Sequence, residues 1–181
     1  MRIDDLSEDM WGMLIGVRVC IRYHDRRRHF FVTAHRFTAA VGAIFGTTTM
    51  AALLGKVDTS LAIVAAALVS TMSVIDLVVG FSESANLHRD LRRRFVELEQ
   101  DIIADHDDAR LGELQRRRLE IEKDEPPVRR ALATLVQNEQ VLSDYPIADA
   151  PRHLVHVGWW QRLTAHFFAH ATPSQALASR G

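Results

Sequence analysis

Two long apolar runs, residues 37–54 and 61–81, are separated by the short polar turn GKVDTS, and they constrain the fold more than any other feature. Neither run contains Lys, Arg, Glu or Pro. As helices they would extend about 27 and 31 Å, close to the ~30 Å hydrocarbon thickness of a bilayer. The runs therefore predict an all-α protein with a transmembrane helical hairpin. The alternative is a pair of buried helices in a soluble all-α bundle.

The two runs differ in strength. The second is rich in Leu, Ile, Val and Ala, whereas the first contains several threonines and two glycines and would be marginal alone. Because a closely spaced pair of helices can insert together, we expect both to cross the membrane.

Arginines flank the outer side of each run, while the turn between them has only Lys56, beside Asp58. By the positive-inside rule, both termini are cytoplasmic and the protein is a multi-pass protein of the cytoplasmic (inner) membrane. The residues expected to fix topology or contact lipid headgroups are Arg26, Arg27, Arg28, Arg92, Arg93 and Arg94. The net charge of −1 gives no bulk field to attract nucleic acid, so we expect no nucleic-acid partner.

Small and polar residues recur at helical spacing within the runs. They are Gly42, Gly46, Thr49, Ala66, Ser70, Ser73 and Asp76. One interpretation is a packing seam, within the hairpin or between copies, because small residues let helices approach closely in lipid. The other is a seam that lines a water-filled path in an oligomer. Asp76, the only ionisable side chain within either run, is expected to face protein or water because a charge in lipid is costly.

The residues after the second run predict a cytosolic helical region. A narrow apolar stripe, typical of a short coiled coil, is formed by Leu87, Leu91, Phe95, Leu98 and Ile102. Two further helices are expected at 109–124 and 127–142, separated by Pro126 and Pro127. Short connections favour antiparallel neighbours, so we expect a small helical bundle beneath the membrane.

The predicted organisation has four parts. Residues 1–36 form a basic amphipathic helix, 37–81 the two-span hairpin, 82–142 the cytosolic helical region, and 143–181 a linker with a C-terminal aromatic helix and a disordered end. That last helix, expected over 153–171, carries Trp159 and Trp160. These two residues would anchor it in the membrane interface, or else it docks on the bundle.

The sequence has no catalytic signature. There is no P-loop, dinucleotide-binding turn, HExxH, GxSxG or CxxC. Residues 105–108 (DHDD) predict a turn with a helix cap, since consecutive helical residues cannot converge on a metal. His166 and His170 lack a local carboxylate or Cys partner, and Cys20 with His24 lacks a pocket. We therefore expect a non-enzyme with no cofactor and no metal.

The chain resembles the SLATT group of bacterial two-span proteins over residues 22–142. The resemblance rests on RYHDRRRHFF before the first run, the two runs with their polar turn, the following FSESANLHRDLRRRFVELEQDI, and RRRLEIEKDEPPVRRAL leading to NEQ at 138–140. It implies an effector that forms homo-oligomers and permeabilises the membrane in antiviral or self-limiting responses, with no catalytic residues. The chain departs from this group in carrying no sensor domain of its own, so we expect any trigger to come from a separate nucleotide-sensing or signalling partner.

Two functions follow from these features. The first is an oligomeric pore-forming or membrane-disrupting effector of a bacterial defence or conflict system. The second is a membrane-anchored helical scaffold without pore activity.

Overall fold

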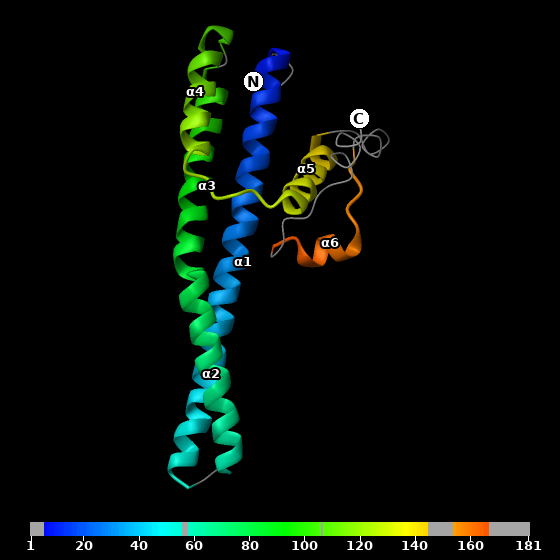
Figure 1. Ribbon diagram of the computed structural model, residues 1–181. Helices are drawn as coiled ribbons and strands as arrows, with labels where there is room; N and C mark the ends of the chain where they lie inside the picture. Colours follow the sequence, from blue (N-terminus) through cyan, green and yellow to red (C-terminus); the bar gives the residue numbers. More distant parts are fainter. Residues whose placement is uncertain (1–5, 56–57, 106, 145–153, 167–181) are drawn as a thin grey trace. The chain divides into compact units, whose positions relative to one another are not determined.

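The computed structural model describes residues 6–55, 58–105, 107–144 and 154–166, and every regular element in these ranges is helical. The elements are α1 (Glu8–Leu53), α2 (Thr59–Val79), α3 (Phe81–Ala104), the 3₁₀ turn η2 (Asp108–Arg110), α4 (Leu111–Glu122), α5 (Arg130–Asp144) and α6 (Trp159–Thr164) (Figure 1). The all-α prediction is confirmed for this part of the chain. The residues divide into two compact units, Met1–Arg26 with Arg89–Gly181, and Arg27–His88.

Helix α1 is continuous from its cap to the end of the first apolar run. The Ser7 hydroxyl accepts a hydrogen bond from the Met10 amide at 3.3 Å, and two acids occupy the first turn, where the helix dipole favours them. No breaker interrupts the helix, as the sequence predicted. It ends at Leu53, and Gly55 follows with a φ of 70°, a left-handed conformation that glycine adopts without strain.

The second apolar run does not continue directly into the next helix. Gly80 has a φ of 61° and its amide donates to the Asp76 carbonyl at 2.8 Å, which closes α2 before α3 starts at Phe81. The prediction of an uninterrupted helix through residue 81 is therefore wrong by this one residue.

In the first unit, α3 runs antiparallel both to the N-terminal part of α1 and to α4. Arg18 pairs with Glu99 at 2.7 Å, and Asp25, further along α1, pairs with Arg92, earlier in α3. Arg117 of α4 pairs with Asp101 of α3. Asp124, which follows α4, pairs with Arg94, which lies earlier in α3, so α4 and α3 are antiparallel as well. The core between these helices consists of Met10, Met13, Leu14, Val17, Leu91, Phe95, Leu98, Ile102, Leu114 and Ile121.

The apolar stripe of α3 is mostly as predicted. Leu91, Phe95, Leu98 and Ile102 are fully buried, but Leu87 is 41% exposed and His88 is buried in its place. The predicted stripe is therefore wrong at its first position, Leu87, and confirmed at the other four.

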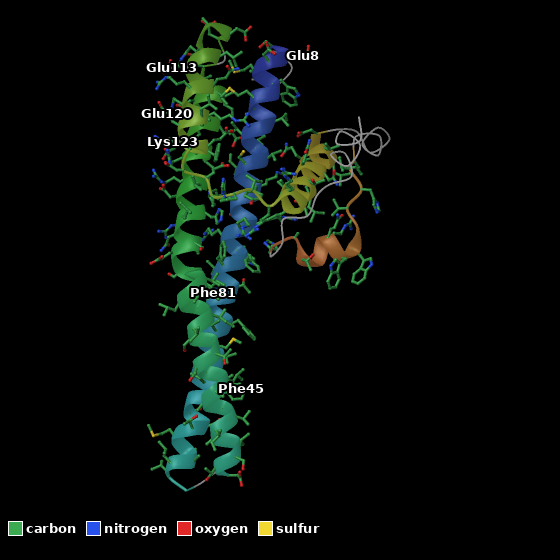
Figure 2. All side chains as sticks on the ribbon, in the orientation of Figure 1. Glu8, Phe45, Phe81, Glu113, Glu120 and Lys123 are labelled. Atoms are coloured by element: carbon green, nitrogen blue, oxygen red, sulfur yellow. The ribbon has the colours of Figure 1, made fainter. Side chains whose placement is uncertain are left out.

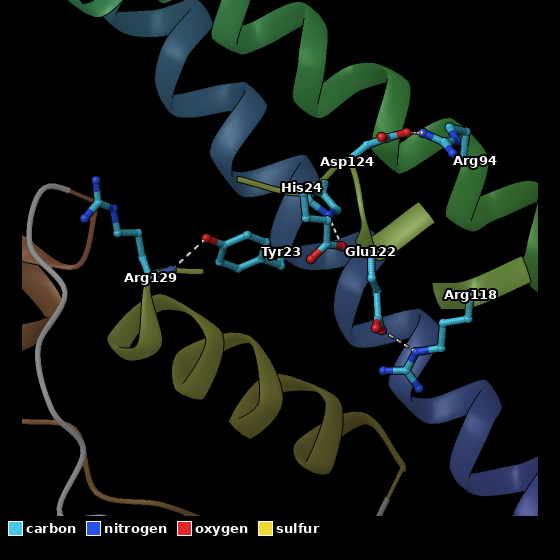
Figure 3. Close-up of polar contacts among 8 residues, drawn as sticks. Tyr23, His24, Arg94, Arg118, Glu122, Asp124 and Arg129 are labelled. Atoms are coloured by element: carbon cyan, nitrogen blue, oxygen red, sulfur yellow. Dashed lines mark hydrogen bonds and ion pairs between the residues drawn. The ribbon is translucent and has the colours of Figure 1, made fainter. Parts of the chain in front are cut away.

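The connection between α4 and α5 is held by two consecutive residues of α1. His24 Nε2 lies 3.0 Å from Glu125 Oε1, and the Tyr23 hydroxyl accepts from the Arg129 amide at 3.0 Å (Figure 3). Residues 126–129 are not helical, so α5 starts at Arg130 rather than at the predicted Pro127. The physical reason is that a proline holds the residue before it out of the helical region, and these contacts fix the segment that follows.

The C-terminal helix is much shorter than predicted. Residues 154–158 are not helical, and Asn138 of α5 exchanges two hydrogen bonds with the Val155 backbone, at 2.7 and 2.9 Å. Ala165 packs with Tyr23 and Leu132. Of the two alternatives for this segment, docking on the bundle is therefore observed. The predicted continuation to residue 171 and the disordered end lie outside the described residues.

Candidate functional site

In the second unit, Arg27–His88, the C-terminal half of α1 pairs antiparallel with α2. Phe31 lies against Phe81 with ring centroids 6.4 Å apart, and His35, further along α1, lies 3.5 Å from Asp76, earlier in the chain than Phe81 (Figure 1). Among the residues shielded wholly or in part, one set recurs every three or four positions: Phe31, Ala34, Thr38, Val41, Phe45, Thr48 and Ala52 of α1, and Ala62, Ala65, Val69, Met72 and Asp76 of α2. This is the spacing of two helices that interlock along a narrow seam.

The outward surface of this unit is apolar. The stretch Thr59–Ala104 contains a window long and apolar enough to cross a membrane, and only 11% of that window is buried. A core helix of a soluble protein would be mostly buried instead. Around Phe45 the outward side chains are mostly carbon (Figure 2). Large exposed apolar residues include Phe37, Ile44, Met50, Leu61, Ile63, Val64, Val74, Leu77 and Val78.

Only one of the two predicted spans meets the requirement for a membrane-crossing helix among the described residues. In α1, Arg36 lies just before the apolar stretch, the helix ends at Leu53, and Thr47, Thr48 and Thr49 dilute the run. The same threonines make this run the weaker of the two in the sequence. The second crossing therefore stays a proposal.

The residues of the predicted small and polar seam lie on different faces. A Cβ added at Gly42 or Gly46 would meet nothing within 4 Å, so this glycine pair packs against no described neighbour. Ser70 and Ser73 are exposed, whereas Thr49 and Ala66 are partly shielded. Gly46 and the two serines are exposed, whereas Gly42 is partly shielded, and the role of all four between copies stays a prediction.

The hydroxyls in the apolar segments bond to their own helices. In α1, Thr47 and Thr48 donate to the Ile44 carbonyl and Thr49 to the Phe45 carbonyl, at 2.7 to 3.2 Å. Thr71 and Ser73 of α2 do the same with carbonyls four residues earlier, at 2.8 and 2.9 Å. Such bonds satisfy a hydroxyl without water or a neighbouring helix. Within one chain, the Thr49 and Ser73 hydroxyls therefore bond to their own helices, and their role between copies stays a prediction.

One ionisable pair lies within this apolar surface. Asp76 Oδ1 is 3.5 Å from His35 Nδ1, too long for a strong hydrogen bond, and this buried oxygen has no hydrogen-bond partner among the residues that the structure describes. The side chains of Asp76 and His35 are 33% and 47% exposed. Asp76 thus contacts protein at His35, and the exposed parts of both side chains face outward.

Phe31 and His88 form an aromatic cluster beside Arg27. Phe31 stacks on His88 with centroids 5.6 Å apart, and the Arg27 guanidinium lies 4.5 Å from the Phe31 centroid. Arg27 is 8% exposed and His88 is 2% exposed. A cation over an aromatic face is stabilised by the ring quadrupole, which explains how Arg27 is buried.

The arginines predicted to contact headgroups are mostly engaged within the chain. Arg26 pairs with Glu139, Arg92 with Asp25, Arg93 with Asp90 and Glu97, and Arg94 with Asp124. Arg27 is buried under Phe31, and Arg28 is exposed. Pairing reduces the charge that these side chains offer to a lipid headgroup. It leaves the positive-inside argument unaltered, because that rule counts Lys and Arg and not net charge.

No family model, curated protein or solved structure matches this chain.

Trp159 and Trp160 are exposed on α6, at 75% and 55%, with their rings edge to face at 5.5 Å. The opposite side of α6 reaches the buried Thr164 and Ala165. The segment can therefore dock on α5 and still present both indoles outward, so an interfacial anchor stays a prediction.

The remaining candidates for chemistry have structural roles in the described part of the chain. The Asp107 carboxylate accepts from the Ala109 amide at 3.0 Å and caps η2, as predicted for this turn. No group of three or more metal-ligating side chains gathers among the described residues. Burial raises the pKa of the Cys20 thiol to about 12, aided by Glu125 and Glu122 and opposed by Arg118. His170 lies outside the described residues.

Sequence reasoning missed His35, His88 and Gln140. The histidine pairs could have been inferred only once the antiparallel register of α1 and α2 was known, since His35 and Asp76 are far apart in sequence. Gln140 occupies a position that helical spacing assigns to the core, which was the one available signal.

Proposed function

We propose that the chain is an oligomeric integral membrane protein that permeabilises the membrane, an effector of a bacterial defence or conflict system as its resemblance to the SLATT group implies. Helix α2 and the C-terminal half of α1 form the membrane-inserted hairpin, with both termini cytoplasmic. The observation that carries the proposal is the His35–Asp76 pair, half-exposed on an otherwise apolar surface.

Insertion is supported by two features of the second unit. Only 11% of its candidate span is buried, and exposing so large an apolar surface to water is unfavourable. The hydroxyls of Thr47, Thr48, Thr49, Thr71 and Ser73 are satisfied by their own backbone, so lipid around them leaves these donors with a partner.

Assembly is supported by the polar part of the same surface. A carboxylate in lipid costs ~2.5–3.5 kcal/mol at the bilayer centre and less near its edge, so Asp76 needs water or another protein surface. The exposed Ser70 and Ser73 and the open Gly42 and Gly46 lie on α2 and α1 and would be covered, or would face water, when copies assemble. A ring of such faces would form a polar path.

Dye release from liposomes tests this proposal. Wild-type protein in vesicles of phosphatidylethanolamine and phosphatidylglycerol should release carboxyfluorescein. Asp76→Leu should reduce the release rate about tenfold or more while leaving the protein in the vesicle fraction, because the polar path loses its charge. Asp90→Asn is the matched control, since Asp90 is an exposed acid paired with Arg93 outside the apolar segment. Equal release by wild type and Asp76→Leu would rule out this role for Asp76.

The alternative is a membrane-anchored scaffold, and the ion-paired helices of the first unit favour it. Arg18–Glu99, Arg117–Asp101 and the contacts of the α4–α5 connection would give a rigid platform for a signalling partner. Induced expression distinguishes the two functions. Loss of membrane potential soon after induction supports the effector, whereas membrane localisation with unchanged potential supports the scaffold.

A further inference from the structure

The first unit contains a half-open groove between α1 and α5 that no part of the proposed function uses. Its cavity volume is about 800 Å³, within the range of small-molecule sites. One wall is the face of α1 that carries Trp11, Ile15 and Val19, and the other is the α5 face that carries Gln140 and Val141. We call it the α1–α5 groove.

Gln140 lines this groove, and its amide oxygen is a hydrogen-bond acceptor without a partner among the described residues. The side chain is 2% exposed, and its Nε2 donates to Asp144 Oδ2 at 2.7 Å, which fixes which end of the amide is the oxygen. Oε1 is buried and has no hydrogen-bond partner among the described residues. A buried acceptor without a donor is unfavourable, so this position requires an N–H or O–H group.

Arg118 of α4 also lines the groove, and its guanidinium uses only Nε in a hydrogen bond to the described residues. Its Nε donates to Glu122 Oε1 at 2.7 Å, while Nη1 and Nη2 make no hydrogen bond to the part of the chain that the structure describes (Figure 3). The guanidinium lies directly on Gly16, where an added Cβ would come within 2.8 Å of Nη1. The terminal nitrogens of a guanidinium bind a carboxylate or phosphate with two parallel hydrogen bonds.

We propose that the α1–α5 groove binds a small organic anion with a flat apolar body and an N–H or O–H donor. The anionic group pairs with Arg118, the donor bonds to Gln140 Oε1, and the body lies against Trp11, Ile15 and Val141. Asp144, held by the Gln140 amide, repels the anionic end and so sets the orientation of the ligand. The groove lies within the first unit, and the proposal does not depend on membrane insertion or pore formation.

Indole-3-acetate is the probe for this site, because it combines an aromatic body, a carboxylate and one N–H donor. Full-length protein in an uncharged maltoside detergent is titrated by saturation-transfer NMR and equilibrium dialysis. We expect saturable binding. 1-Methylindole-3-acetate lacks the donor and 3-methylindole lacks the anion, and each should bind at least about tenfold more weakly. Uptake that grows linearly with concentration, or equal binding of the three compounds, would overturn the proposal.

Variants locate the binding. Arg118→Met should weaken indole-3-acetate about tenfold or more, and Arg116→Met should not, although Arg116 occupies the same helix and pairs with Glu120 as Arg118 pairs with Glu122. Gln140→Met should weaken indole-3-acetate and leave 1-methylindole-3-acetate unchanged.

A filling variant keeps the proposal falsifiable if Gln140→Met fails to fold. Gly12 also lines the groove, and a Cβ there meets nothing within 4 Å, so Gly12→Leu should occupy the groove without disturbing the helices. Wild-type affinity in folded Gly12→Leu would place the probe elsewhere and contradict the proposal.

Discussion

At the scale of single residues, buried polar groups determine how the first unit is joined. His24 is 1% exposed, stacks on Phe95 with centroids 5.6 Å apart, and contacts Glu125, so one side chain links α1, α3 and the α4–α5 connection. Sequence patterns describe such positions as apolar and give no indication of the polar partner. A buried histidine is inferable from spacing, whereas its contact across 101 residues is not.

The Tyr23 hydroxyl should contribute more to the free energy of unfolding than an ordinary surface hydroxyl does. Tyr23→Phe leaves the part-buried Arg129 amide without its acceptor, and we expect the free energy of unfolding to fall by about 1–2 kcal/mol. Chemical denaturation in detergent measures it. Thr134→Val is the control, because that exposed hydroxyl bonds only to its own helix, and its change should stay within about 0.5 kcal/mol. Equal effects of the two variants would contradict the role given to Tyr23.

Cys20 should react slowly in the folded protein. Desolvation, with Glu125 and Glu122 nearby, raises the pKa of the thiol from 9.0 to about 12, so its thiolate population near pH 8 falls by about 1,000-fold and alkylation by iodoacetamide slows accordingly. Because the folded pKa lies above the unfolded one, this group's contribution to stability is complete below about pH 9 and is lost as pH rises toward 12.

The alkylation rate of native Cys20 is compared with two reference rates. The same chain unfolded in guanidinium chloride should react at the rate of a free thiol, and so should Gln115→Cys on a Cys20→Ala background, since residue 115 is exposed. Equally fast alkylation of native Cys20 would contradict its burial.

At the scale of elements, the helices were predictable and their ends less so. The continuity of α1 followed from the absence of Pro and Gly between Arg18 and Phe37, and the narrow α3 stripe followed from its spacing. The predicted helix at 153–171 failed because Asn138 binds the Val155 backbone in an extended form, a tertiary contact that overrides local propensity. The residues of the predicted seam lie on more than one face of α2, because sequence spacing alone does not say which face the partner helix covers.

Gly80, which lies between α2 and α3, should tolerate substitution by alanine poorly. Its left-handed φ of 61° costs an alanine about 1–2 kcal/mol, so Gly80→Ala should lower the unfolding free energy by that amount. Gly112→Ala should be neutral or stabilising by a few tenths of a kcal/mol, because residue 112 is helical and its Cβ position is open. Thermal unfolding of both variants in detergent checks the opposite signs, and a Gly80→Ala protein as stable as wild type would show that the break between α2 and α3 is not required.

At the scale of the whole molecule, the charged residues separate into two kinds of environment. In the first unit the arginines satisfy carboxylates, and in the second the described charges within the apolar segments reduce to Asp76, paired with His35. Sequence alone identified the apolar segments and the exceptional acid. It could not supply the histidine partner, because that contact depends on the register of two helices.

Fractionation of the wild-type chain tests membrane insertion. Cells expressing the chain are lysed, membranes are washed with alkaline carbonate, and the pellet is solubilised in mild detergent for mass measurement. We expect the protein to stay in the washed membranes and to be recovered in detergent as a defined multimer. A protein released by carbonate, or recovered without detergent as a soluble monomer, would contradict membrane insertion.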